Sequence, residues 1–385
     1  MVGLLPPDIE KVDGGVVAVM LNLLSGFSRM ENIEVTMVSF NQEIEKSKSI
    51  EYSSNIRIHY IPYKTKFKLI DYFINRKRLN EIIQTVKPDI LHIQEVTPHI
   101  LRFIHLPKEF IVATQHGIMS EEIKYAIGIK DKLQCLFKGY VERMVFPYFK
   151  NIIFISDYNK RLFSGKNFFD QKIYNPVNSI FFERPKEQGK MNSIIYVGRL
   201  NKNKNQSLVL NALGALRKES INFDLHVVGG YKDDYYESVV TSLMAEHDLA
   251  NQVKFYGWQT QEQILKVYEK GRIFILPSQQ ETMPVAIAEA MAQGKVIIAS
   301  NVGAISEMFS DKFSGFLFER NNLEQLTEIL KSLYNNEAVI ENVSVNAIQE
   351  AKEKFYPDSI ARQTLDFYKK VLARGGNTRE NFKTF

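Results

Sequence analysis

Residues 272–300, RIFILPSQQETMPVAIAEAMAQGKVIIAS, contain the pattern on which the fold prediction depends. The apolar runs 273–276 and 296–299 are each typical of a buried strand. Between them we expect a short helix that begins near Pro284 and ends at Gly294, because proline is favoured in the first helical turn and glycine just after the last. A strand, a helix and a strand in this order predict a βαβ unit of a parallel sheet.

Glu289 lies inside this helix, and its neighbours from Val285 to Ala292 are all apolar. The helix should therefore be buried on nearly all sides. A buried carboxylate without partners costs several kcal/mol, so some group must donate hydrogen bonds to it. Either a lysine or arginine in the core or the hydroxyl groups of a ligand would serve, and the apolar surroundings favour the ligand.

Glu281 precedes the helix and follows the first strand. Ligands of open α/β sheets bind at the C-terminal ends of the strands, so Glu281 is expected at the mouth of a crevice. Glu289 is expected about two turns along the helix that lines it. One extended ligand can then touch both carboxylates. The alternative is that Glu281 is simply exposed to solvent.

The segment E-T-M-P-V-A-I-A-E-A-M-A-x-G closely resembles the E-x7-E signature of retaining, nucleotide-sugar-dependent glycosyltransferases of family 4, and the following residues 296–307 resemble the V-I-A-S-x-x-G-x-x-x-E that accompanies it. Two departures are visible. Residues 282–284 are Thr-Met-Pro where Gly-Phe-Gly is commonest, and Lys295 stands where proline is usual. Neither departure changes a carboxylate.

The resemblance implies the GT-B fold, an α/β fold in which two Rossmann-like domains face a central cleft. It also implies that Glu281 holds hydroxyl groups of the donor sugar and that Glu289 holds the ribose. The backbone of Met283, Pro284 and Val285 is expected to assist at the same donor.

A second candidate site lies in the segment from Gly198 to Lys204, GRLNKNK, which follows a predicted strand and precedes a helix. Cations beside a glycine and a helix N-terminus form an anion site. Arg199 and Lys204 are better candidates than Lys202, because they match the family's G-R-L…K motif, whose cations neutralise the leaving nucleoside diphosphate. The family often has glycine after that lysine, whereas this chain has Asn205.

The first half of the chain offers two weaker motifs. Gly14 and Gly15 precede a predicted helix, and His116 follows the predicted strand 111–115. By itself the Gly-Gly pair is as consistent with a turn as with a site, and a lone histidine at such a position is more often structural. In the resembled family the Gly-Gly loop faces the donor phosphates and the acceptor. A His-Gly pair lies near the donor sugar and the reacting centre, so His116 is assigned there as a hydrogen-bonding group.

The alternation of predicted strands and helices indicates two α/β domains. We expect residues 1–178 to form an N-terminal Rossmann-like domain that binds the acceptor, and residues 179–357 to form a C-terminal Rossmann-like domain that binds the nucleotide sugar. A last helix within residues 358–385 is expected to return to the first domain.

Composition excludes several classes of protein. The chain has 385 residues, 45% of them hydrophobic, a net charge of +5 and a single cysteine, Cys135, which cannot form an internal disulfide. It contains no G-x-G-x-x-G fingerprint and no nucleic-acid-binding motif. No run reaches the roughly 18 apolar residues of a spanning helix, and no signal peptide is visible, so we expect a cytoplasmic protein.

Residues 64–78 hold six lysines or arginines against one acid, interleaved with apolar residues. Such a basic amphipathic segment can lie on an anionic membrane surface at the inner face of the membrane. A solvated helix face packed on the sheet is an equally good interpretation.

The resemblance therefore implies an enzyme that moves a sugar from a nucleoside diphosphate, UDP above the others, to a hydroxyl group of a saccharide or lipid-linked acceptor. The sugar would keep its anomeric configuration, and cell-surface polysaccharide synthesis is the expected setting. No cofactor is implied beyond the nucleotide-sugar substrate, and no metal, because Arg199 and Lys204 supply the charge. The alternatives are a non-catalytic nucleotide-sugar-binding scaffold on the same fold and a sugar phosphorylase, for which the chain is short.

Overall fold

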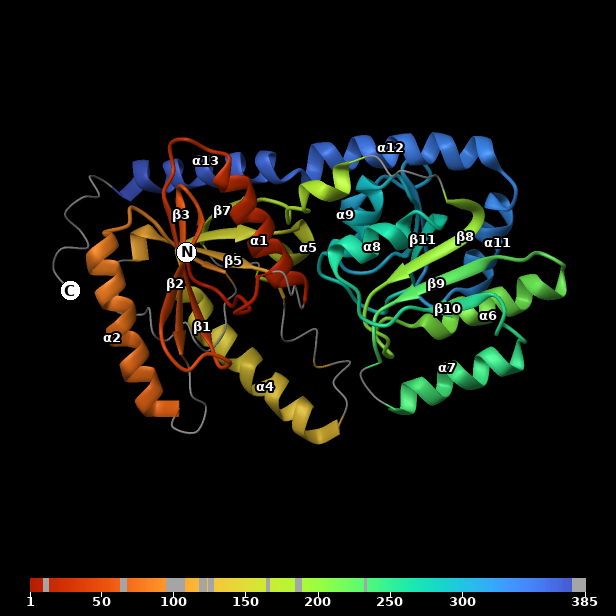
Figure 1. Cartoon of the computed structure of the whole chain (residues 1–385), viewed down its shortest axis with the longest axis horizontal. Helices are drawn as coiled ribbons and strands as arrows, with labels where there is room; N and C mark the ends of the chain where they lie inside the picture. Colours follow the sequence, from red (N-terminus) through yellow and green to blue (C-terminus); the bar gives the residue numbers. More distant parts are fainter. Residues whose placement is uncertain are drawn as a thin grey trace. The chain divides into compact units, whose positions relative to one another are not determined.

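The computed structural model of the chain divides into two compact units (Figure 1). Unit 1 comprises Met1–Pro176 and Pro357–Phe385, and unit 2 comprises Val177–Tyr356. The structure describes residues 1–9, 14–62, 68–94, 108–117, 123, 128–163, 167–183, 189–231 and 234–375. Each unit combines a largely or wholly parallel sheet with helices, which confirms the predicted α/β class.

Unit 1 is built on strands that follow one another with helices between most of them. The strands are β1 (Val35–Asn41), β2 (Lys48–Ser53), β3 (Ile56–Pro62), β4 (Leu91–Gln94), β5 (Ile111–Gln115), β6 (Asn151–Phe154) and β7 (Phe169–Lys172). The helices are α1 (Gly15–Ser28), α2 (Lys68–Val86), α4 (Gly128–Val145), α5 (Asp157–Leu162) and α13 (Pro357–Gly375), with short 3-10 turns at Lys108–Phe110 and Phe146–Tyr148.

The first residues of the chain join two groups of strands in unit 1. One group has the order β1-β3-β2 and the other the order β4-β5-β6-β7. Val2 forms a parallel bridge to Val38 of β1 and another to Ile93 of β4. Val2 is therefore a short bridging segment between the two groups of strands. All pairings are parallel except that of β2 with β3.

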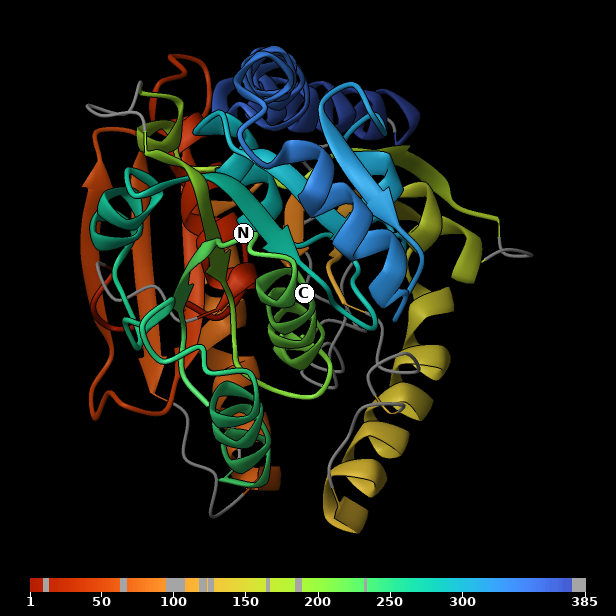
Figure 2. The ribbon, with the colours of Figure 1, turned by 90° about the vertical axis from the view of Figure 1, so that its right-hand side faces the viewer.

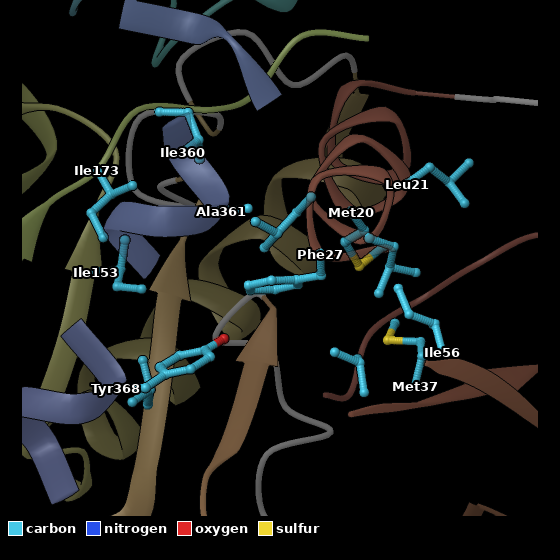
Figure 3. Close-up of a cluster of buried hydrophobic side chains, with 14 of the residues drawn as sticks. Met20, Leu21, Phe27, Met37, Ile56, Ile153, Ile173, Ile360, Ala361 and Tyr368 are labelled. Atoms are coloured by element: carbon cyan, nitrogen blue, oxygen red, sulfur yellow. The ribbon is translucent and has the colours of Figure 1, made fainter. Parts of the chain in front are cut away.

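The C-terminal helix α13 belongs to unit 1, the domain to which the sequence predicts a last helix returns, and it packs against α1 (Figure 1). Phe27 of α1 and Ala361 and Tyr368 of α13 are fully or almost fully buried in one hydrophobic cluster with residues of the sheet (Figure 3). The two helices approach closely at Gly26, where a Cβ atom would lie 2.6 Å from the carbonyl oxygen of Pro357. The last helix of the chain thus completes the core of unit 1.

Unit 2 also consists of strands that follow one another with helices between most of them. Its strands are β8 (Lys190–Val197), β9 (Asp224–Val228), β10 (Val253–Phe255), β11 (Gly271–Leu276), β12 (Val296–Ser300) and β13 (Gly315–Phe318). Its helices are α6 (Gln206–Lys218), α7 (Asp234–Glu246), α8 (Gln261–Tyr268), α9 (Val285–Ala292), α10 (Ile305–Met308), α11 (Leu323–Leu333) and α12 (Glu337–Phe355), with a 3-10 turn at Ser179–Phe182.

The strand order in unit 2 is β10-β9-β8-β11-β12-β13, and every pairing is parallel. From β8 the chain builds outward to β10 and then returns past β8 to start the other half with β11. This is the order of a doubly wound dinucleotide-type sheet. Helices α6 and α7 lie on one face, and α8, α9 and α12 lie on the other (Figure 1). The predicted βαβ unit is confirmed as β11, α9 and β12.

Among the helices that the structure describes, none combines the length and the apolar character needed to cross a membrane.

Candidate active site

The predicted residues of unit 2 lie at the point where its strand order reverses. Strands β8 and β11 are neighbours, although helices α6, α7 and α8 intervene in the sequence. Gly198 directly follows β8, and Ser278 and Glu281 follow β11. Helices leave this place toward opposite faces of the sheet, so the loops after the two strands diverge and leave a site for a ligand at the strands' carboxyl ends.

Backbone hydrogen bonds join these two loops. The amide of Gln279 donates to the carbonyl oxygen of Asn203 at 2.7 Å, and the side-chain amide of Asn203 donates to the carbonyl oxygen of Gln280 at 3.3 Å. Asn205 has φ 53° and ψ 42°, in the left-handed region that asparagine tolerates better than most residues. Asparagine can therefore replace the family's usual glycine at this position.

Lys204 and Glu281 form an ion pair between the two loops. Their side chains are 20% and 9% exposed, respectively, so the pair is largely shielded from water. Ser278 Oγ donates to the same carboxylate oxygen of Glu281 at 2.7 Å, and Ser300 Oγ donates to the carbonyl oxygen of Ser278 at 2.5 Å. Glu281 is thus a buried, oriented acceptor beside Lys204, and the interpretation that it is merely solvated is wrong.

Gly303 allows the chain to pass directly behind Glu281. Its φ is +58°, and a Cβ atom there would lie 1.6 Å from the carbonyl oxygen of Glu281. A side chain at this position would displace the backbone that carries the carboxylate.

Glu289 lies on α9 as predicted, and six of the eight residues of this helix are buried. The helix begins at Val285 with Pro284 as its N-cap, so Glu289 lies about one turn into the helix rather than the two turns expected from the spacing. Burial raises the pKa of Glu289 to about 7. Within the described residues no lysine or arginine forms an ion pair with it, and the core ion pair considered above is not formed.

The residues between the two carboxylates are partly covered. Met283 is 6% exposed, and Pro284 and Val285 are half-buried. Pro284 has an extended backbone and turns the chain into α9, whose first amides point back toward the loop.

Arg199 extends an exposed side chain from a firmly held backbone. Its carbonyl oxygen accepts hydrogen bonds from Tyr196 Oη at 3.0 Å and from Gln206 Nε2 at 2.9 Å. The structure therefore places Arg199 and Lys204 on one loop, where Lys204 contacts Glu281 and Arg199 is exposed. Lys202 is also exposed.

His116 belongs to unit 1 and follows β5 directly. It is 6% exposed, and burial lowers its pKa to about 4, while Asn175 beside the ring acts in the opposite direction. Its Nε2 lies 2.8 Å from Gln94 Oε1, which can only accept, so Nε2 carries the proton. Nδ1 is buried without a hydrogen-bond partner in the described part of the chain and has a lone pair available.

Gly14 and Gly15 lie at the start of α1, also in unit 1. Gly14 has φ 100°, a conformation that L side chains rarely adopt, and no heavy atom lies within 4 Å of the position of a Cβ there. The preceding residues 10–13 lie outside the described part.

Two polar residues that contact the candidate groups were not predicted. Gln94 ends β4 and fixes the tautomer of His116, and Ser278 fixes a carboxylate oxygen of Glu281. Their position just at or after the end of a buried parallel strand is a signal that could have identified both.

Comparison with known proteins identifies the family of the chain and its fold. Two family profiles match successive parts of the chain, "Glycosyltransferase Family 4" over residues 13–179 and "Glycosyl transferases group 1" over residues 178–354. An uncharacterized glycosyltransferase of Methanocaldococcus jannaschii is 24% identical over 359 residues, which cover 89% of this chain and 90% of that protein. The amylovoran biosynthesis glycosyltransferase AmsK of Erwinia amylovora is 28% identical over 184 residues, 46% of this chain and 44% of AmsK. The chain thus aligns with less than half of AmsK.

Among solved structures, HepE of Anabaena in complex with UDP-glucose superposes with a TM-score of 0.71 at 15% identity, covering 96% of this chain and 99% of that chain. At this identity the likeness shows the fold alone, which is the GT-B fold.

Proposed function

Because the chain belongs to the family 4 glycosyltransferases, we propose that it transfers a sugar from a nucleoside-diphosphate sugar to a hydroxyl group of a saccharide or lipid-linked acceptor, with retention of the anomeric configuration. The observation that carries this proposal is the Lys204–Glu281 pair at the strand-order reversal of unit 2. A sugar diphosphate has hydroxyl groups that suit a carboxylate acceptor next to phosphates that suit a cation.

In the proposed reaction the bond between the anomeric carbon and the diphosphate oxygen breaks, and the acceptor oxygen bonds to that carbon from the same face. The acceptor proton passes to the departing diphosphate. Glu281 orients the sugar hydroxyl groups, and Arg199 and Lys204 neutralise the charge that develops on the leaving group. These fixed cations can act without a metal ion.

Glu289 takes the ribose in this proposal. A carboxylate that is costly to ionise in its apolar setting gains most from two hydroxyl donors, because hydrogen bonds to the charged form offset the desolvation. In unit 1, the neutral His116 offers Nδ1 as an acceptor for a substrate hydroxyl group.

UDP is the proposed nucleotide and cell-surface polysaccharide synthesis the proposed setting. HepE was solved with UDP-glucose, and AmsK is named for amylovoran biosynthesis, and these names support the proposal. We propose that the protein works in the cytoplasm, in peripheral contact with an anionic membrane. The basic segment 64–78 is one candidate for this contact, although its side chains up to residue 74 lie outside the described part.

The test is release of nucleoside diphosphate from a panel of UDP-, GDP- and ADP-sugars, with short saccharides and a polyprenyl-diphosphate saccharide as acceptors. One nucleotide sugar should support turnover, and Glu281→Ala should reduce it by roughly a hundredfold or more. Lys202→Ala, in the same loop, is the matched control and should retain activity. The anomeric coupling constant of the product, measured by proton NMR, tests retention.

Binding of a nucleotide sugar without turnover on any acceptor, unaffected by Glu281→Ala, would instead identify a non-catalytic scaffold. An inverted product would exclude the proposed stereochemistry while leaving the transfer itself in place.

A further inference from the structure

Helix α4 of unit 1 exposes a line of large apolar side chains. Leu133, Leu136, Phe137, Tyr140 and Met144 are 60%, 56%, 64%, 63% and 64% exposed. Their spacing puts them on one face of the helix over about 17 Å, because each residue adds about 1.5 Å. These five residues are called the α4 stripe below.

The opposite face of α4 makes a polar contact with strand β5 of unit 1. Glu142 is 4% exposed, and its carboxylate accepts a hydrogen bond from Gln115 Nε2, next to His116. Val145 and Gly139 are buried on the same side. In a helix that packs only against its own protein, the apolar face would be the covered one. In α4 the apolar face is the exposed one, and the face that carries Glu142 is covered.

The charges around the α4 stripe favour an anionic surface as its binding partner. Lys132 is exposed and lies beside the stripe, and the helical spacing places positions 130 and 143, a lysine and an arginine, next to it as well. Lys138 is half-buried and lies toward the face of Glu142. Residues 128–145 contain four lysines or arginines and two acids, of which Glu142 is buried in the contact just described. Lysine stems can lie along apolar surface while their ammonium groups reach anionic headgroups.

A second copy of the chain fits the α4 stripe less well. Leu133, Phe137, Tyr140 and Met144 do follow the spacing of a coiled-coil seam, but the pattern extends over two heptads, short of the three or four that indicate a coiled coil. Leu136 widens the stripe beyond such a seam. A wide apolar face with cations at its sides is instead typical of helices that lie in a membrane interface.

We propose that the α4 stripe inserts into the headgroup boundary of an anionic lipid bilayer and thereby docks unit 1 on the membrane. Helix α4 extends away from the sheet of unit 1 in both views of the molecule (Figures 1 and 2). The inference rests on the proposed function in one respect: docking would bring a lipid-linked acceptor to the enzyme.

The experiment measures binding of the full chain to vesicles of phosphatidylcholine with phosphatidylglycerol, by flotation over a range of lipid concentrations. The double variant Phe137→Ser/Met144→Ser should bind roughly tenfold or more weakly, because two large apolar side chains no longer leave water. The matched control is Phe313→Ser/Val345→Ser, which removes two side chains of similar exposure, 53% and 64%, from unit 2. It should bind like the unaltered chain.

Insertion is measured directly with Tyr140→Trp in a Trp258→Phe background, since Trp258 is the chain's single tryptophan. Its fluorescence should shift to the blue on binding and should be quenched by lipids brominated on their acyl chains. Binding without quenching, or binding that 0.5 M salt abolishes, would mean adsorption by charge and would overturn insertion.

Two further outcomes would also overturn the proposal. One is equal vesicle binding by the Phe137→Ser/Met144→Ser variant and the unaltered chain. The other is no vesicle binding together with a concentration-dependent dimer that this variant abolishes, which would assign the α4 stripe to a second copy. Release of nucleoside diphosphate with a water-soluble acceptor is assayed in parallel. Loss of vesicle binding with this activity intact separates failure of docking from failure of the proposed function.

Discussion

Lys204 and Glu281, 77 residues apart in the sequence, form a largely buried ion pair at the carboxyl ends of β8 and β11. The cation suits the phosphates of a sugar diphosphate, and the carboxylate suits its hydroxyl groups. Each of the two groups also stabilises the other. The pair therefore links the stability of unit 2 to its proposed activity.

We expect Lys204→Met to lower kcat/KM by roughly a hundredfold or more, because the leaving diphosphate loses a fixed cation. The free energy of unfolding of the same variant should be lower by about 1–3 kcal/mol. Glu281 keeps its hydrogen bond from Ser278 but loses the positive charge of Lys204. Steady-state kinetics and urea unfolding measure the two effects. Lys202→Met, at an exposed position of the same loop, should change neither. Equal losses in both variants would show that the loop's general charge, and not this pair, is what matters.

Glu289 should make unit 2 less stable as the pH rises. Burial raises its pKa from the unfolded value of 4.5 to about 7, so the folded state holds the proton more tightly, and ionising the group between about pH 4.5 and 7 costs free energy. Glu289→Gln should remove this slope and be up to about 3 kcal/mol more stable at pH 8 than the unaltered chain, with no advantage at pH 4.

The measurement for Glu289 is the difference in unfolding free energy between variant and unaltered chain at several pH values, with the exposed Glu262→Gln as control. The stabilised Glu289→Gln variant should at the same time bind the nucleotide roughly tenfold or more weakly, because the ribose loses a charged acceptor. A variant that is destabilised at pH 8 and binds nucleotide normally would contradict both the pKa and the role.

His116 should remain neutral, with its proton on Nε2, throughout pH 5–8. Burial lowers its pKa to about 4, and Gln94 Oε1 accepts from Nε2. Nitrogen-15 chemical shifts of the histidine rings report both the charge and the tautomer. Gln94→Met should mix the tautomers and reduce kcat by roughly tenfold, while KM for the nucleotide sugar changes less. A titration midpoint of His116 near 6.5, the ordinary pKa of histidine, would disprove the assignment.

Gly26→Ala should destabilise unit 1 by about 1–3 kcal/mol, because the added methyl group would lie 2.6 Å from Pro357 O and 2.8 Å from Ala361 Cβ. The direction of the change in stability is informative. In an isolated helix alanine is more stable than glycine by about 1 kcal/mol, so helix propensity alone would predict a gain. Thermal unfolding measures the effect, and Lys369→Ala on the exposed face of α13 is the control. A gain in stability would mean that the contact between α1 and α13 is looser than the structure shows.

Much of the fold could be predicted from local sequence patterns. The β11–α9–β12 unit has strongly apolar strands and a helix bounded by proline and glycine, so periodicity alone identified it. The strands β2, β7, β9 and β13 were not predicted. Strand β9 lies inside the sheet of unit 2, between β10 and β8, and its five residues include Asp224 and His226 among the apolar ones. The other three are short strands at sheet edges, and β2 and β7 are mostly polar, so their sequences resemble loops until a neighbour supplies the hydrogen bonds.

The sequence by itself determined the residue types of the site and their place after particular strands, because an apolar run followed by a polar loop depends on neighbours in the chain. Contacts between distant segments were decided by the tertiary structure alone. The β8–β11 adjacency brings Lys204 to Glu281, the packing of β4 beside β5 brings Gln94 to His116, and the rotation of α4 turns its apolar face outward. Hydrogen bonds and burial depend on distances across the sheet, and no local spacing in the chain encodes those distances.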